Sequence, residues 1–278
     1  MGQETTGSTL AAFSEELAGI VERVAHSVVR VDDGTRLTAS GVIWSADGLI
    51  LTTSHGTERD HDLAIELGDG SRHNATLLGR DEETDFALLK VDAAGLPALE
   101  RGSDEAAKLG SLVLAVARPG NFGVGATLGI LSGRSASQRG GRDEAILHTD
   151  AAFHFGFSGS ALVDMQGRIL GINNLAFGRG KSVALGVSIA EHTVESLLKH
   201  GHNRRGYLGI RTQLVPITES LRTTLTLAQE QGLLVFAVEA DSPAEKAGIV
   251  LGDTLLAVNN QPLNDVDDLR RTLRTLHA

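Results

Sequence analysis

The spacing of apolar positions changes near residue 26. Between residues 10 and 25 they recur every three or four positions, at Leu10, Phe13, Leu17, Ile20 and Val21. This spacing places them on one face of a helix, so we predict a helical segment within residues 1–25. From residue 27 to about residue 190 the apolar residues instead form short runs between Gly, Asp and Ser, such as SVVRV, LILTT, FALLKV and VALGVSI. Such runs are typical of an all-β barrel or sandwich.

A second block with a different pattern follows. A helical pattern at residues 191–200 and the polar stretch GHNRRG at 201–206 close the first block. Beyond them, YLGI, LLVFAV and TLLAVNN predict strands, whereas SPAEKAG and NDVDDLRRTLRTL predict helices. We therefore expect three parts: a helical segment over residues 1–25, a mainly β domain over 26–203 and a small α+β domain over 204–278.

Composition removes several classes of protein. The 278 residues carry 35 acidic and 25 basic side chains, a formal charge of −10. This balance argues against a nucleic-acid partner. The chain has no Cys and no HExxH motif, so we expect no disulfide and no metal site.

The sequence predicts neither a membrane span nor an export signal. No stretch approaches about 18 uncharged apolar residues, the length that spanning requires. Residues 1–25 contain charged side chains and no apolar block. Localisation therefore stays open, with the cytoplasm as the interpretation of the chain as it stands.

Three residues could form a hydrolytic triad. Ser158 lies in the tight turn GFSGS between Gly156 and Gly159, His55 follows the strand-like run LILTT, and Asp85 precedes FALLKV. A hydroxyl nucleophile needs a His to take its proton and a carboxylate to orient that His. On chemistry alone the alternatives are a surface histidine, a turn aspartate and a plain Gly-Ser turn.

The order of the surrounding motifs narrows these alternatives. The chain resembles the HtrA/Deg family of trypsin-like serine proteases in the strings SVVRV, SGVIWSADGLILTTSH, DEETDFALLKV and HTDAAFHFGFSGSALVDMQGRILGIN. It resembles the PDZ domain of that family in YLGI and VEADSPAEKAGIVLGDTLLAVNNQPLNDVDDL. The resemblance covers about residues 18–276. It implies a trypsin-like double β-barrel followed by a small α+β PDZ domain, with no metal, nucleotide or organic cofactor.

The resemblance also assigns roles in the site. It makes His55 the general base, Asp85 its orienting carboxylate and Ser158 the nucleophile, with backbone N–H groups of Gly156 and Ser158 as the oxyanion hole. Three neighbours depart from the family pattern: Phe157 replaces Asn, Ser160 replaces Gly, and Gly56 replaces an aliphatic residue. Ser160 is expected to strain the loop if its position requires a positive φ.

The resemblance places the walls of the substrate pocket in three stretches without an acidic residue. A small aliphatic side chain before the scissile bond is therefore expected, because the phenylalanines would crowd a large one. The wall residues are Phe153, Phe155, Phe157, Asn174, Ala176, Gly186 and Ser188.

In the second domain the resemblance implies a groove for peptide ends. The loop Tyr207, Leu208, Gly209 and Ile210 stands where PDZ domains hold a terminal carboxylate through backbone N–H groups. Leu269 and Leu273 on the last predicted helix are groove or core residues. The family continues after this helix with a final strand, so the domain is expected to lack that strand.

Two functions remain to be separated. The first is an ATP-independent serine endopeptidase that cleaves unfolded or partly unfolded polypeptides in protein quality control. The alternative is a catalytically impaired peptide-binding or chaperone-like protein that keeps the protease fold, motivated by Phe157 and Ser160. The family also implies a homotrimer through the N-terminal helix, and its members are mostly exported or membrane-tethered.

Overall fold

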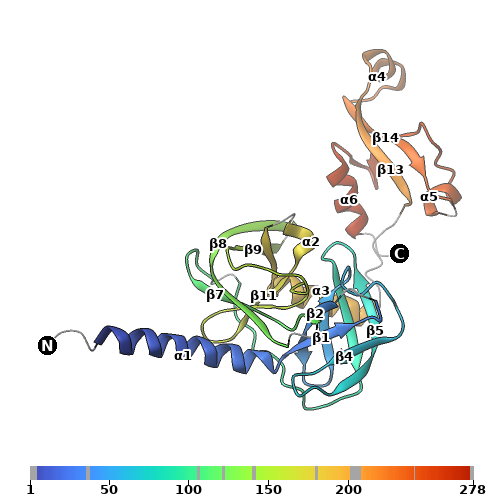
Figure 1. Ribbon diagram of the computed structural model, residues 1–278. Coiled ribbons are helices and arrows are strands. Elements are labelled where there is room, and N and C mark those ends of the chain that lie inside the picture. The colour runs from blue at the N-terminus through green and yellow to red at the C-terminus, as the bar shows by residue number, and fades with distance from the viewer. Residues whose placement is uncertain are drawn as a thin grey trace. The chain divides into compact units, whose positions relative to one another are not determined.

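The computed structural model describes residues 5–35, 38–104, 107–120, 123–139, 142–178, 181–200, 208–240 and 242–275. The chain divides into two compact units, residues 1–203 and 204–278. The first unit holds two barrels and three helices, and the second holds a small mixture of strands and helices (Figure 1).

Six antiparallel strands close the first barrel in the order β1-β2-β3-β6-β5-β4. They are β1 (Val28–Asp32), β2 (Thr38–Ser45), β3 (Leu49–Thr53), β4 (Leu63–Glu66), β5 (Arg72–Asp81) and β6 (Phe86–Val91). All of β3 is buried because its alternate residues face two different cores. Ile50 points into the barrel, whereas Leu49 and Leu51 join the apolar cluster outside it.

The second barrel repeats this strand order, as β10-β11-β12-β9-β8-β7. Its strands are β7 (Leu112–Ala117), β8 (Gly125–Arg139), β9 (Arg142–Thr149), β10 (Ala161–Val163), β11 (Ile169–Asn173) and β12 (Ser182–Gly186). The core of the first barrel consists of aliphatic side chains, whereas the core of the second adds Phe157 and, partly buried, Phe153.

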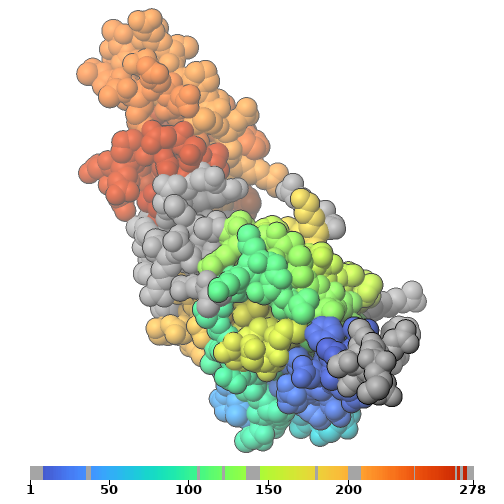
Figure 2. All heavy atoms as spheres, turned by 90° about the vertical axis from the view of Figure 1, so that its left-hand side faces the viewer, coloured from blue at the N-terminus to red at the C-terminus, as the bar shows by residue number. Residues whose placement is uncertain are grey.

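A third apolar cluster joins the barrels to two helices. Helix α1 (Thr5–Ala25) buries Ile20 and Val24 there, and helix α3 (Val187–His200) adds Val194 and Leu197. The N-terminal half of α1 extends away from the barrels, where 68% of Leu10 is exposed (Figure 1). In Figure 2 this blue helix lies beside green strands of the second barrel, in agreement with its packing on β7.

The second unit is a small α+β arrangement around a thin core. A three-stranded sheet, β13-β14-β15, lies beside a two-stranded one, β16-β17, and Leu233, Leu263 and Leu269 are its buried centre. Its elements are β13 (Ile210–Pro216), α4 (Glu219–Leu225), β14 (Gln231–Val238), α5 (Pro243–Lys246), β15 (Thr254–Leu255), β16 (Ala257–Val258), β17 (Gln261–Pro262) and α6 (Val266–Thr275).

Several element boundaries differ from the sequence prediction. The run VALGVSI is a strand only as far as Gly186, and α3 begins at Val187 instead of residue 191. Burial explains the error, because Val187, Ile189 and Ala190 form the buried face of the first helical turns and resemble a strand in sequence. Helix α4 was not predicted; Thr218 caps its N-terminus by accepting from the Leu221 N–H.

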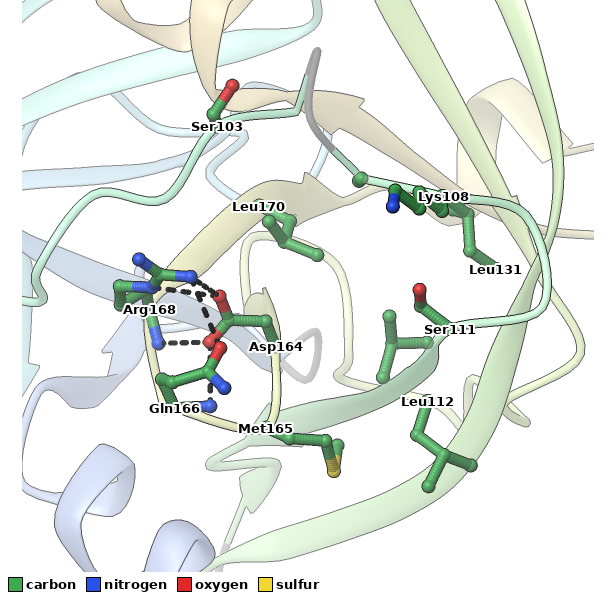
Figure 3. A pocket seen from close by; sticks show the side chains of 12 residues that line it. Ser103, Lys108, Ser111, Leu112, Leu131, Asp164, Met165, Gln166, Arg168 and Leu170 are labelled. Carbon is green, nitrogen blue, oxygen red and sulfur yellow. Dashed lines mark hydrogen bonds and ion pairs between the residues drawn. The ribbon is translucent and has the colours of Figure 1, made fainter.

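A hollow of about 470 Å³ opens at the rim of the second barrel, beside β7 and the turn after β10. Leu112, Met165 and Leu170 line its apolar side, and the Asp164–Arg168 ion pair of 2.7 Å lies on its wall (Figure 3). The candidate site residues do not line this hollow. Some of them line two other hollows, one in each unit, which are described below.

Candidate active site

His55 occupies a tight turn immediately after β3. The Thr57 N–H donates to the Ser54 carbonyl at 3.0 Å, so residues 54–57 form a β-turn with His55 and Gly56 at its centre. Gly56 suits this place because an added Cβ would lie 2.5 Å from the Ala39 Cβ. The Ala39 methyl group therefore occupies the space that an aliphatic side chain at position 56 would need.

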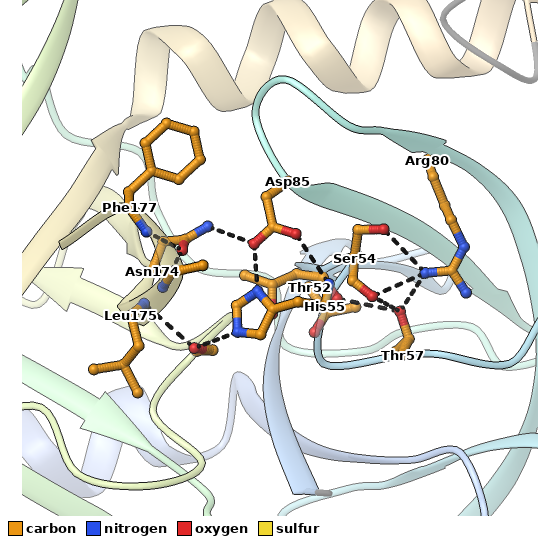
Figure 4. Close-up of polar contacts among 12 residues, drawn as sticks. Thr52, Ser54, His55, Thr57, Arg80, Asp85, Asn174, Leu175 and Phe177 are labelled. Carbon is orange, nitrogen blue, oxygen red and sulfur yellow. Dashed lines mark hydrogen bonds and ion pairs between the residues drawn. The ribbon is translucent and has the colours of Figure 1, made fainter. Parts of the chain in front are cut away.

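Asp85, in the loop between β5 and β6, forms hydrogen bonds to this turn. Its carbonyl accepts from the Ser54 N–H at 2.6 Å, its Oδ1 accepts from the His55 N–H at 2.9 Å, and its Oδ2 contacts His55 Nδ1 (Figure 4). Asp85 reaches all three groups from a left-handed conformation, with φ of 57°. A carboxylate on Nδ1 leaves that nitrogen protonated and Nε2 free to accept a proton.

Ser158 completes the chain of contacts from the second barrel. Its Oγ lies 3.0 Å from His55 Nε2, and the Leu175 N–H lies 3.4 Å from the same oxygen. The structure thus brings Asp85, His55 and Ser158 together in the order that nucleophilic hydrolysis requires. His55 and Ser158 are 103 residues apart in the sequence, and His55 and Asp85 are 30 apart.

The turn before Ser158 leaves two backbone donors open. The Phe157 N–H donates to the His154 carbonyl at 3.0 Å, and Gly156 has φ of 85°, which is the type II turn that requires Gly at its third position. Within the part of the chain that the structure describes, no group accepts from the N–H of Gly156 or of Ser158. Such open donors are what an oxyanion hole supplies.

Ser40 of the first barrel holds the nucleophile loop across the barrel boundary. Its N–H donates to the Ser158 carbonyl at 3.0 Å and its Oγ donates to the Gly156 carbonyl at 2.7 Å. The same Oγ accepts from the Arg118 N–H at 3.0 Å. Sequence reasoning did not identify Ser40, because its partners come from a distant segment.

The two departures in the nucleophile loop are accommodated. Ser160 is fully buried, does not have a positive φ, and accepts a 2.8 Å hydrogen bond from Asn173 Nδ2, so the expected strain is absent. Phe157 is buried against the rings of Phe153 and His154, at centroid distances of 6.4 and 5.5 Å. Phe157 therefore anchors the loop in the core of the second barrel.

Two of the predicted pocket walls, Phe155 and Phe157, border one of the described hollows. This hollow has a volume of about 470 Å³, and its other lining residues include Pro119, Gly125 and Thr127. Phe155 is 68% exposed and Phe153 is partly buried in the second barrel core.

Asn174 has a different environment from the one predicted. It is fully buried, and its Nδ2 donates to Asp85 Oδ2 at 2.9 Å, so it contacts the acid of the triad (Figure 4). Its Oδ1 accepts from the Ala176 N–H at 2.9 Å, which begins the short helix α2 (Leu175–Gly178). The sequence signal for this contact with Asp85 was the position of Asn174 directly after a buried strand.

A buried carboxylate lies beside the remaining wall residues. Asp104 Oδ2 accepts from Ser188 Oγ at 2.7 Å, and it would lie 2.1 Å from a Cβ on Gly186. No acidic residue occurs within the three wall stretches themselves. Folding nevertheless brings Asp104, from a distant segment, next to Gly186 and Ser188.

In the second unit a groove of about 410 Å³ forms between the start of β13 and α6. Leu208, Gly209, Ile210, Leu269 and Leu273 line it, together with Phe236, Glu239 and Val266, which were not predicted. Tyr207 lies outside the described residues. Strand β13 is an edge strand, so its outer backbone groups are open to an added strand.

The described ranges contain neither a metal-binding group nor a membrane-spanning helix. These residues contain no group of three or more His, Cys, Asp or Glu side chains placed to hold a metal ion. Among the helices described, none is long and apolar enough to cross a membrane.

Comparison with known proteins agrees with this geometry. A model of the trypsin-like peptidase domain matches residues 39–172, and a model of the PDZ domain matches residues 234–278. Among curated relatives, a "Probable periplasmic serine endoprotease DegP-like" from Rhizobium meliloti is 34% identical over 87% of this chain and 49% of its own length. Its counterpart from Pseudomonas putida is 36% identical over 86% of this chain and 50% of its own. The chain thus spans about half the length of these relatives.

Solved structures extend the likeness along nearly the whole chain. "HtrA-type protease AlgW with decapeptide" is 31% identical with a TM-score of 0.66, and covers 94% of this chain and 90% of its own. A serine endoprotease from Yersinia pestis is 32% identical with a TM-score of 0.69, over 94% and 88% of the two chains. Because these likenesses span both barrels and the second unit, the chain belongs to the HtrA/Deg family of trypsin-like serine proteases with a PDZ domain.

Proposed function

We propose that this chain is an ATP-independent serine endopeptidase of unfolded or partly unfolded polypeptides. The continuous chain of contacts from Asp85 through His55 to Ser158 carries the proposal. His55 Nε2 takes the Ser158 proton as Oγ attacks the peptide carbonyl, and the protonated imidazole then gives that proton to the leaving amine. Water, deprotonated by His55, hydrolyses the acyl-enzyme and restores Ser158.

The charge that develops on the carbonyl oxygen would be met by the N–H groups of Gly156 and Ser158. Removing one such donor in other enzymes lowers kcat by about 100- to 1000-fold. Both N–H groups are free of acceptors within the described residues, which supports a formed oxyanion hole. Loss of activity through Ser160 or Phe157 is not favoured, since neither forces the loop out of this geometry.

Substrate recognition would use both units. We propose a small aliphatic residue before the scissile bond, because the family resemblance puts Phe153 and Phe155 in the pocket wall, where they would crowd a large side chain. The groove lined by Gly209 and Leu269 would take the C-terminal end of a peptide, added as a strand on β13. Solved HtrA-type structures named with a decapeptide and a tripeptide support a peptide ligand for this family.

We propose a location, an assembly and domain limits for the chain from the names of its relatives and from its exposed side chains. The curated relatives are named periplasmic, so the cytoplasmic interpretation is not supported, and we propose that the protein acts after export. We also propose a homotrimer through α1, consistent with exposed apolar side chains on α1 and on the outer faces of β7 and β8: Leu10, Phe13, Leu112, Leu128 and Ile130. We assign residues 26–203 to the protease domain, after the helical segment 1–25, and 204–278 to the PDZ domain.

The direct test is digestion of reduced casein by the wild type and by Ser158→Ala, followed on a gel and by mass spectrometry. We expect fragments with the wild type only, cut after small aliphatic residues. A repeat with an added hydrophobic C-terminal peptide covers an enzyme that needs PDZ occupancy. Absence of Ser158-dependent cleavage in both conditions would contradict the protease, and cuts dominated by Lys or Arg would contradict the pocket.

A further inference from the structure

Arg80, near the end of β5, contacts both sides of the turn that carries His55. Its Nη1 donates to the Ser54 carbonyl at 3.0 Å, to Ser54 Oγ at 3.2 Å and to Thr57 Oγ1 at 2.9 Å (Figure 4). Ser54 and Thr57 are the first and last residues of the β-turn, so one guanidinium nitrogen joins its two ends.

The rest of the same guanidinium holds the chain just beyond the turn. Arg80 Nη2 donates to the Arg59 carbonyl at 2.8 Å and to Asp60 Oδ1 at 3.1 Å, and Nε donates to the same Asp60 oxygen at 3.2 Å. The Arg80 side chain is only 18% exposed, whereas the Asp60 side chain is 79% exposed. The buried part of the interaction is therefore the part made to Ser54 and Thr57.

Only an arginine fits this arrangement. The acceptors lie at residues 54, 57, 59 and 60, and a planar fork with five N–H donors reaches them together. A lysine ammonium carries a similar charge at a single point and cannot bridge the turn and the following segment at once. The contacts thus depend on the shape of the guanidinium as well as on its charge.

We propose that Arg80 is a positioning residue for His55. It acts through the Ser54–Thr57 turn and does not touch the reacting atoms, and the inference rests on the proposed peptidase function. Asp85 fixes one face of the turn through the Ser54 and His55 N–H groups, and Arg80 fixes the carbonyl and hydroxyl groups on its other side. Arg80 lies near the end of β5, and Asp85 lies in the short loop between β5 and β6. One short segment of the chain therefore supplies both the orienting acid and the arginine that supports the turn.

The kinetic test compares Arg80→Ala with wild type on fluorescein-labelled casein. We expect kcat to fall about 10- to 100-fold, since a misplacement of about 1 Å can cost about 100-fold, while KM changes less than about twofold. Arg80→Lys should stay close to Arg80→Ala. Equal kcat in Arg80→Ala and wild type, or full recovery by Arg80→Lys, would overturn the proposal.

Two control variants separate positioning from general damage. Arg72→Ala removes another ion-paired arginine of the same strand, whose partner Asp32 is not a residue of the His55 turn, and should leave kcat unchanged within about twofold. Asp60→Ala removes only the exposed acceptor and should likewise have a small effect. A loss in either control as large as in Arg80→Ala would point to general destabilisation and overturn the proposal.

A readout that needs no activity is hydrogen–deuterium exchange of residues 54–60. We expect faster exchange there in Arg80→Ala, in the wild-type and the Ser158→Ala backgrounds, with the strands of the second barrel unchanged. Unchanged exchange would overturn the positioning role. Faster exchange without any Ser158-dependent cleavage by the wild type would instead reject the peptidase and keep the role of Arg80 in the turn.

Discussion

The two halves of the triad are held in different ways. The His55 turn, on the first barrel, is held mainly by side chains, since Asp85 and Arg80 both bond its backbone. The Ser158 loop, on the second barrel, is held mainly by backbone groups. The Gly159 N–H donates to the Asn173 carbonyl at 2.8 Å, and the Ser40 N–H of the other barrel donates to the Ser158 carbonyl at 3.0 Å, with one side-chain contact added by Ser40 Oγ.

This difference follows from what each half has to do. The base needs a fixed imidazole direction and a charged partner, which side chains provide. The nucleophile loop has to keep N–H groups unpaired and close to a substrate carbonyl, so it needs glycines and a close backbone approach. The first half should therefore tolerate backbone changes better than the second.

The largest effect is expected at Gly159. Its φ is 83°, and an added Cβ would lie 2.1 Å from the Ser40 carbonyl oxygen. Gly159→Ala must therefore displace the loop, and we expect kcat/KM on casein to fall about 100-fold or more. Gly70→Ala is the matched control, because Gly70 has the same φ of 83° with no atom within 4 Å of its Cβ. It should cost about 1–2 kcal/mol of stability and leave activity intact. Equal activity losses in the two variants would contradict the close approach at Ser40.

A smaller effect is expected at Ser40. Ser40→Ala removes the donor to the Gly156 carbonyl and the acceptor of the Arg118 N–H, both buried or partly buried. Groups left without partners cost about 1–3 kcal/mol each, so we expect a lower Tm and a roughly 10-fold lower kcat. Ser45→Ala on the same strand removes an exposed contact to Asp47 and serves as the control. If Ser40→Ala keeps full activity, the Ser40 hydroxyl is not needed to hold the loop, and the backbone bond from the Ser40 N–H to the Ser158 carbonyl is sufficient.

The smallest effect concerns pH and the first barrel alone. Burial alone would raise the pKa of Asp33, but hydrogen bonds from Thr35 and from the Thr35 and Glu58 N–H groups lower it below its ordinary value. A lowered pKa in the folded state stabilises the protein above the ordinary pKa of 3.8, and this contribution is lost as the pH falls through the folded value.

Thermal unfolding of Asp33→Asn and wild type between pH 3 and pH 7 checks this sign. The wild type should have the higher Tm near neutral pH, and the difference should start to shrink only as the pH falls below about 4, toward the lowered folded pKa. Activity at neutral pH should change little, because Asp33 holds the segment after the turn and not His55 itself. A Tm difference that grows toward acid pH would contradict the lowered pKa.

Local sequence signals pointed to the candidate catalytic residues. Ser158 between glycines, His55 after an apolar run and Asp85 before another are visible because strand ends and turns have local signatures. The mainly β class of the first unit and the α+β class of the second followed from the same periodicities. The predicted start of α3 was wrong, because a buried helical turn that contains Val187 and Ile189 has the alternating apolar pattern of a strand.

The sequence by itself determined the family, the two kinds of domain and the three side chains proposed for catalysis, because these depend on residue types in a fixed order along the chain. Only the tertiary structure placed Ser40 under the nucleophile loop, Arg80 on the His55 turn, Asn174 on Asp85 and Asp104 beside Ser188. Each is a contact between residues 26 to 116 positions apart. Such pairs carry no local pattern, since strand pairing within each barrel and the packing of the two barrels decide which groups meet.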